Sequence, residues 1–269
     1  ISACLVGSEM CIRDRNTMND KTFLSYLKHA DKPFSGWDFS FIDDTGRMKS
    51  DLLSWSYGSM ALSLIQDSKS MLDMGTGGGE FLSKLGPFPS SAYATECYLP
   101  NVPVATERLT PLGVQVVQID DDEDLPFESG QFDLIINKHE SYSVEEVRRI
   151  LSKGGLFFTQ QVGGHDCEEI NEKLGVPLNE EFKDWNLEKA LKEIEKHDFK
   201  ILKSREECPT QRFYDIGALV YYLKAIPWQA PGFEVNQYKD ELYAIHKMIE
   251  EKGYFDVTQY RFMILAEAI

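Results

Sequence analysis

The fold is decided by residues 71–80, which read Met-Leu-Asp-Met-Gly-Thr-Gly-Gly-Gly-Glu. An apolar run leads into a glycine-rich turn, and residues 81–85 after it have a helical composition. Glycine takes backbone angles that other residues resist, and it lets the main chain come close to a ligand. The stretch therefore predicts a strand, a ligand-binding turn and a helix, in that order.

The glycine spacing argues against a dinucleotide-binding turn. The fingerprint G-x-G-x-x-G, started at Gly75, requires its third glycine at position 80, where Glu80 stands instead. The pattern is D-x-G-x-G-x-G, starting at Asp73. A nicotinamide or flavin enzyme is thus the weaker interpretation of this turn.

Short apolar runs alternate with helical stretches along the rest of the chain. Helices are expected over 81–85 and 144–152 and around Leu187–Ile194, and alternation of this kind favours parallel strands joined by right-handed crossovers. We therefore predict an α/β, doubly wound, mostly parallel sheet. The runs expected to form its strands are 70–74, 92–95, 114–119, 132–137, 156–162, 199–204 and 262–266.

About fifty residues between the last two runs carry two further helical patterns. A simple connection needs only a few residues, so we predict a helical insertion that caps the ligand-binding edge of the sheet. The opening residues resemble a translated sequencing adapter and are excluded from the fold. The predicted divisions are a non-native segment 1–15, a helical lead-in 16–69, a core 70–206, a cap insertion 207–257 and a final strand within 258–269.

Together with the glycine turn, three later segments resemble the class I S-adenosylmethionine-dependent methyltransferases. Glu96 follows the second strand, where the family keeps an acidic residue, and residues 119–127 resemble the family segment D-A-x-x-L-P-F. Residues 131–137 and 151–157 resemble the fourth strand and the turn into the fifth. The resemblance covers roughly 70–162. It implies a Rossmann-like, seven-stranded sheet and S-adenosylmethionine as cofactor, with S-adenosylhomocysteine as product.

The resemblance also assigns roles within the cofactor site. Glu96 would accept both ribose hydroxyls, a task suited to a carboxylate because its oxygens only accept. Asp121 would take the adenine amino group, whereas Asp122 stands where alanine is usual, which leaves only its backbone N–H a role at the adenine. The implied cofactor-binding residues are Asp73, Gly75, Thr76, Gly77, Gly79, Glu96, Asp121, Asp122 and Asn137.

The sequence indicates the catalytic and acceptor-binding residues less clearly than the cofactor-binding residues. Methyl transfer is an in-line displacement that depends mainly on alignment; an oxygen acceptor would benefit from a base, for which His139 is the candidate. A hydrogen bond that merely fixes the strand end is the alternative role of His139. Segments 137–141, 159–164 and 212–228 resemble an uncharacterised bacterial subgroup, which suggests as substrate-binding candidates Tyr57, Glu140, Gln160, Arg212, Tyr214 and Trp228.

Several of these candidates have a structural alternative. Gln160 and Gln161 would point to opposite faces of a strand, so at most one faces the site. Aromatic residues at helical spacing are often core, and Arg212 could equally be a surface arginine. No ligand spacing supports a metal site, although His139, Glu140, His165, Asp166 and Cys167 were considered, so none is predicted.

The formal net charge of -16 bears on the partner. Nucleic-acid binding depends on Lys and Arg neutralising phosphates, which makes a nucleic-acid substrate unlikely and favours a small-molecule acceptor. An RNA or protein methyltransferase and a non-catalytic cofactor-binding module stay open as alternatives. Neither a spanning segment nor a signal peptide is indicated, and the scattered Cys97, Cys167 and Cys208 suit a reducing compartment, so we expect a cytoplasmic protein.

Overall fold

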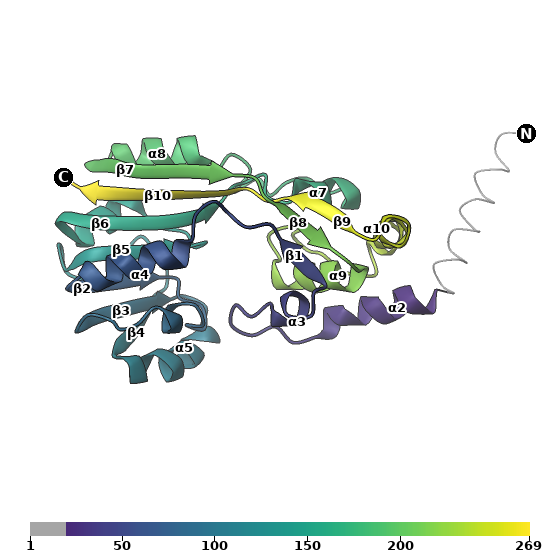
Figure 1. Cartoon of the computed structure of the whole chain (residues 1–269), viewed down its shortest axis with the longest axis horizontal. Helices are drawn as coiled ribbons and strands as arrows, with labels where there is room; N and C mark the ends of the chain where they lie inside the picture. Colours follow the sequence, from purple (N-terminus) through teal and green to yellow (C-terminus); the bar gives the residue numbers. More distant parts are fainter. Residues whose placement is uncertain (1–19) are drawn as a thin grey trace, which may run out of the picture.

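The computed structural model describes residues 20–269, and the predicted non-native segment 1–15 lies outside them (Figure 1). Its main feature is a seven-stranded sheet of order β4-β3-β2-β5-β6-β10-β7. The central pairs β4-β3, β3-β2, β2-β5 and β5-β6 are parallel, whereas β10 runs antiparallel to β6 and β7. The predicted fold class is confirmed. The strands are β2 Ser70–Met74, β3 Ser91–Glu96, β4 Val114–Gln118, β5 Phe132–Lys138, β6 Leu151–Val162, β7 Phe199–Glu207 and β10 Arg261–Ala268.

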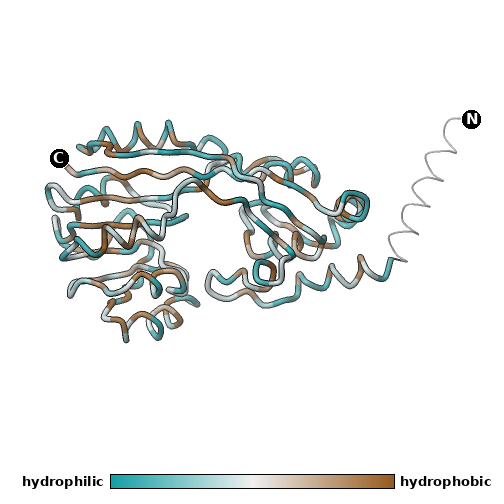
Figure 2. Tube along the Cα trace, in the orientation of Figure 1, coloured by the Kyte–Doolittle hydropathy of each residue, from teal (hydrophilic) through white to brown (hydrophobic). Residues whose placement is uncertain are grey.

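Helices cover both faces of this sheet because neighbouring strand residues alternate between two apolar clusters. On β2, Met71 packs into one cluster with α4 (Tyr57–Asp67) and α5 (Asn101–Leu109). Its neighbour Leu72 packs into the other with α6 (Val144–Ile150) and α8 (Leu187–Glu195). The strands are largely apolar along the Cα trace, while the outer faces of the helices are hydrophilic (Figure 2).

A second, smaller sheet of order β1-β8-β9 lies beside the large one (Figure 1). Its strands β1 (Met48–Ser50), β8 (Thr210–Phe213) and β9 (Phe255–Thr258) are antiparallel. The helices of this unit share a third apolar cluster with its strands. They are α2 Lys21–Leu27, α3 Ser40–Asp43, α7 Glu168–Leu174, α9 Ile216–Ala225 and α10 Lys239–Lys252.

The predicted helical lead-in and helical cap insertion both contain helices, but they also contribute strands that were not expected. Two of the three strands come from the predicted insertion 207–257, and the third comes from the lead-in 16–69. The insertion's strand β8 has its backbone groups satisfied on one side by β1 and on the other by β9. The first part of the lead-in and the insertion therefore form one structural unit, whereas α4 of the lead-in packs on the large sheet. No helix within residues 20–269 is long and apolar enough to cross a membrane.

Two predicted helices end earlier than expected. The stretch 81–85 forms only one 3₁₀ turn, Leu82–Lys84, because Gly86 and Pro87 follow it and disfavour continuation. The helix expected over 144–152 ends at Ile150, since Leu151 already pairs with Phe132 of β5 as the first residue of β6. The glycine turn is thus followed by a short, tight segment rather than by a long helix.

Candidate functional site

The glycine turn after β2 is packed on two sides and open on a third. A Cβ added at Gly75 would meet the side chain of Glu140, and one at Gly79 would lie 2.8 Å from Leu109. A Cβ at Gly77 would meet only Trp37, at 3.7 Å. All three glycines have φ between 61° and 76°, the left-handed region that favours glycine. Gly77 is therefore the point where a ligand can reach the main chain.

Carboxylates of three different segments gather around this turn. Glu96 ends β3 and accepts a hydrogen bond from the Tyr98 backbone N–H at 2.8 Å. Burial raises the pKa of Glu96, and burial with repulsion from Asp122 and Glu96 raises the pKa of Glu140 to about 7. Burial raises the pKa of Asp73, at the end of β2, to about 7 as well. Such a cluster favours a ligand with positive charge and hydroxyl donors.

The two consecutive aspartates after β4 have different surroundings. Asp121 is exposed, and its carboxylate accepts hydrogen bonds from the backbone N–H groups of Glu123 and Asp124 at 2.9 and 3.2 Å. Asp122 is half-buried and accepts the hydroxyl of Ser141 at 2.5 Å, and burial raises its pKa. The structure thus turns Asp122 toward Glu140, whereas Asp121 stabilises its own loop.

The side chain of Asn137, near the end of β5, is engaged in hydrogen bonds within the protein. Its side-chain oxygen accepts hydrogen bonds from Thr159 Oγ1 at 2.9 Å and Gln161 Nε2 at 2.7 Å, and its Nδ2 donates to the Ser141 carbonyl at 3.3 Å. The side chain is fully buried. Asn137 therefore holds the loop after β5 in place, and these contacts occupy the groups that could otherwise bind a ligand.

His139 is held in a defined protonation state by its neighbours. Trp55 Nε1 can only donate, and it donates to Gln160 Oε1 at 2.8 Å, which fixes the orientation of the Gln160 amide. The Gln160 NH₂ group then donates to His139 Nε2 at 2.9 Å. The proton of the neutral imidazole must be on Nδ1, and burial lowers the pKa of His139 well below its usual value. His139 also has a φ of 62°, unusual for a residue other than glycine.

A cavity of about 1090 Å³ lies between the end of β5 and β6 and the smaller sheet. Lys138 and the following loop residues form one wall, and Gln211 of β8 contributes to the opposite one. The ring planes of Trp37 and Trp228, which also line it, are stacked with centroids 5.8 Å apart. Asp166 and Arg261 form a buried ion pair in its lining. Glu140 and Ser141 belong to both this cavity and the glycine-turn region.

The structure brings only some of the predicted substrate-binding residues to this cavity. Glu140 and Trp228 line it. Tyr57 stacks on Phe158 in the core, with ring centroids 4.6 Å apart, and donates its hydroxyl proton to the Asn137 carbonyl. Gln160 supports His139, as described above, and is not part of the cavity lining.

Arg212 and Tyr214, two further predicted substrate-binding residues, lie outside the cavity lining. Arg212 makes two hydrogen bonds to Asp256, at 2.6 and 2.7 Å, and its guanidinium covers the ring of Tyr254. Neighbouring residues of a strand point to opposite faces, so Gln211 reaches the cavity and Arg212 does not. Tyr214 is exposed outside the cavity lining.

Several residues that line the cavity are not among the site residues predicted from the sequence, and Gln161, Trp37, Gln211 and Lys138 are examples. Gln161 was weighed against Gln160, and the alternation of the strand did signal that only one of them faces the site. Trp37 and Gln211 come from segments that approach the core only in three dimensions. Lys138, whose pKa burial lowers to about 8, was within a segment already singled out. Strand alternation was thus the only usable signal.

Comparisons with known proteins bear on the family and the fold. Residues 72–159 match the family of methyltransferase domains. A methyltransferase candidate from Bacillus halodurans C-125 is similar in structure, with a TM-score of 0.55 and 17% identity over 78% of this chain and 98% of that one. The YcgJ protein from Bacillus subtilis has a TM-score of 0.55 and 13% identity over 78% and 97%. No curated protein matches the sequence. At these identities the structural likeness shows the fold.

Proposed function

We propose that the chain is a class I S-adenosylmethionine-dependent methyltransferase and that its acceptor is a small molecule bound in the cavity; the match of residues 72–159 to the methyltransferase-domain family supports the activity. One observation carries the proposal. The cavity of about 1090 Å³ meets the glycine turn through Glu140, which packs against Gly75, and Trp37, which lies beside Gly77. Small-molecule sites are concave, largely apolar and supplied with a few fixed polar groups, and their volumes reach about 1000 Å³.

The residues around the turn fit S-adenosylmethionine. Glu96 would accept the ribose hydroxyls, and the main chain at Gly77 is open to close approach. Asp122 and Glu140 would attract the positive charge of the cofactor, and Thr76 Oγ1 is buried near Asp73 without completing a hydrogen bond. When bound, this cofactor supplies an electrophilic methyl group on a sulfonium.

The protein's own contribution to the displacement is positioning and exclusion of water. Trp37 and Trp228 close one side of the cavity with stacked rings. His139 has its Nε2 lone pair occupied by Gln160, so it acts as a hydrogen-bond donor through Nδ1 rather than as a base. The acceptor atom is then one that has a lone pair available at neutral pH and does not need His139 to remove a proton from it.

The acceptor carries an oxygen that can accept a hydrogen bond, such as a carbonyl or carboxylate. Gln211 Nε2 is buried in the cavity wall and has no partner among the described residues, because Gln211 Oε1 is the atom that contacts Gln259 and Ser50. A buried donor left without a partner costs free energy, which an acceptor oxygen on the substrate would recover. The aromatic walls suit an apolar remainder of the molecule.

The test is formation of S-adenosylhomocysteine, measured by mass spectrometry, across a panel of small carboxylates, amides and ketones. We expect turnover with members of the panel and a raised KM in Gln211→Glu, which replaces the donor by an acceptor. Gln115→Glu, at an exposed position of β4 opposite Tyr93, is the matched control and should behave as wild type.

Two results would overturn the small-molecule proposal. Methylation of proteins or RNA in an extract, without turnover of any small acceptor, would make the acceptor a macromolecule. Tight cofactor binding with no transfer to either kind of acceptor would make the chain a non-catalytic binding module.

A further inference from the structure

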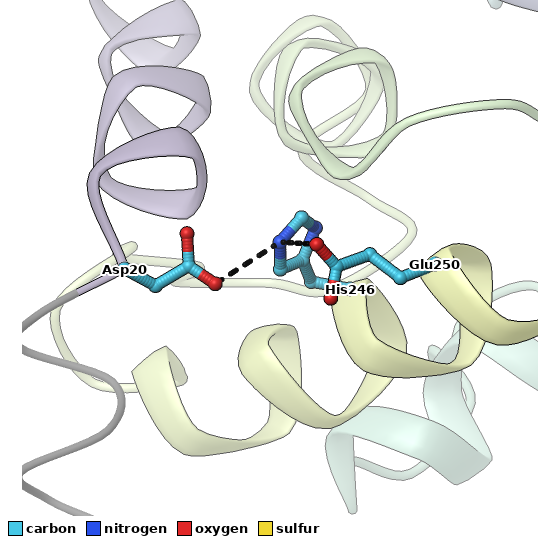
Figure 3. Close-up of side chains that lie close together, drawn as sticks. All are labelled: Asp20, His246 and Glu250. Carbon is cyan, nitrogen blue, oxygen red and sulfur yellow. Dashed lines mark ion pairs between the residues drawn. The ribbon is translucent and has the colours of Figure 1, made fainter.

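A cluster of three side chains lies in the smaller unit, outside the cavity (Figure 3). Asp20 precedes α2 as its N-cap, and His246 and Glu250 lie one turn apart on α10. His246 Nε2 is 3.5 Å from Asp20 Oδ2 and 3.5 Å from Glu250 Oε1. Residues four apart on a helix share a face, so α10 itself orients two of the three groups.

The buried imidazole nitrogen is the observation that points to a ligand. His246 is only 3% exposed, and its Nε2 has no hydrogen-bond partner among residues 20–269. The rings of Phe23, Tyr26 and Tyr243 surround the imidazole, with their centroids 5.4–6.2 Å from that of His246. Figure 3 shows the nitrogen directed between the two carboxylates. Separations of 3.5 Å are too long for good N–H···O hydrogen bonds, so neither carboxylate satisfies it.

Each carboxylate has one oxygen engaged and one free. Asp20 Oδ1 accepts the Phe23 backbone N–H at 2.9 Å, as an N-cap does, and Oδ2 faces His246. Glu250 Oε2 pairs with Lys247, and Oε1 faces His246. The cluster thus presents one imidazole nitrogen and two carboxylate oxygens, all within 4.8 Å of one another.

We propose that these three atoms bind a divalent transition-metal ion of the zinc class. Imidazole and carboxylate ligands bind Zn²⁺ at about 2.0–2.2 Å, and a tetrahedral arrangement then separates neighbouring ligand atoms by about 3.3 Å. The two N···O distances of 3.5 Å are close to that value. Calcium takes about six to eight oxygen ligands and does not fit an imidazole with two carboxylates. The fourth position would be open to water.

Such an ion would connect the lead-in to the insertion. Asp20 belongs to the segment before the core, and α10 belongs to the segment before the last strand. None of the three ligands lines the cavity. The site would therefore stabilise the smaller unit and is independent of methyl transfer.

The experiment uses the full chain, free of any histidine tag and stripped with a chelator, and titrates Zn²⁺ by calorimetry and by thermal unfolding. We expect one Zn²⁺ per chain and, at zinc concentrations near 100 times Kd, a Tm raised by about 5 °C. Asp20→Asn keeps a capping side chain and Glu250→Gln keeps the size, yet each should weaken zinc binding at least tenfold. Glu251→Gln, an exposed neighbour on α10, is the matched control and should bind as wild type.

Two outcomes would overturn the proposal. One is the absence of stoichiometric zinc uptake by folded wild-type protein. The other is uptake that Asp20→Asn and Glu250→Gln leave unchanged, which would place the zinc elsewhere. Because the readouts are binding and Tm, they do not depend on methyl transfer.

Discussion

Two carboxylates beside the glycine turn have no cationic partner among residues 20–269, whereas two other carboxylates of low exposure, Asp166 and Asp215, are each paired with an arginine. Beside the turn, Glu96 and Glu140 have raised pKa values, and neither forms an ion pair with any residue of the described chain. In the cavity lining Asp166 is paired with Arg261, and in the smaller unit Asp215 is paired with Arg47 at 2.5 Å. Paired ions belong to the folded chain by itself, whereas desolvated carboxylates without a cation are typical of a ligand site.

The largest effect should come from breaking the pair in the cavity lining. Arg261→Met leaves the Asp166 carboxylate buried with only the Tyr260 backbone N–H, at 2.6 Å, as a strong partner. Removing one partner of a buried ion pair costs about 3–5 kcal/mol. Urea unfolding should show this loss in the cofactor-free protein. A loss below about 1 kcal/mol would contradict the structural role of the pair.

A smaller stability effect, of opposite sign, is expected at the turn. Burial raises the pKa of Asp73 to about 7, so the folded protein holds this proton more tightly than the unfolded chain. Stability should therefore fall as pH rises from about 4 to about 7 and level off above that. Asp73→Asn removes this contribution and should be more stable than wild type at pH 8, by at most about 4 kcal/mol. Equal pH slopes for the two proteins would rule out the effect.

Cofactor affinity should depend on pH through Glu140. Its pKa of about 7 means that the carboxylate is largely protonated below neutral pH, and a cationic ligand prefers the ionised form. Wild-type affinity for S-adenosylmethionine should rise several-fold between pH 5.5 and 7, and Glu140→Gln should show a smaller slope. Calorimetry at three pH values measures this. An unchanged slope in the variant would place Glu140 away from the cofactor's charge.

The smallest effect is expected at Arg212. Its pair with Asp256 is one-third exposed, and the side chain lies outside the cavity. Exposed ion pairs contribute little to stability. Arg212→Met should shift the urea midpoint far less than Arg261→Met does and should leave cofactor binding unchanged. A loss of binding would restore Arg212 as a site residue.

The core was predictable because its strands are buried on both faces. Ser70–Met74 has the bounds expected from its apolar run, and the glycine turn and Glu96 have the positions that the family pattern implies. The spacing of the glycines also separated this turn correctly from a dinucleotide-binding one. Local pattern was sufficient here because each of these signals is contained in a few consecutive residues.

The smaller unit was not predictable in the same way. The strand Met48–Ser50 has three residues, too few for any periodicity to be read. Trp37 and Gln211 reach the cavity only through pairing and packing between distant segments. Asp20 and His246 likewise come from distant segments and meet in a separate cluster. The sequence predicted no metal site because the third ligand lies at the other end of the chain from the i, i+4 pair.

The most direct test of the account is calorimetric binding of S-adenosylhomocysteine to wild type, Glu96→Ala and the control Glu107→Ala, an exposed position on α5. A hydrogen bond to a charged group contributes about 1.5–3 kcal/mol, so Glu96→Ala should weaken binding by about 10- to 150-fold. Glu107→Ala should match wild type, with a Kd in the micromolar range. Folded wild-type protein that does not bind, or Glu96→Ala that binds equally well, would contradict the assignment of the carboxylate-lined turn as the cofactor site.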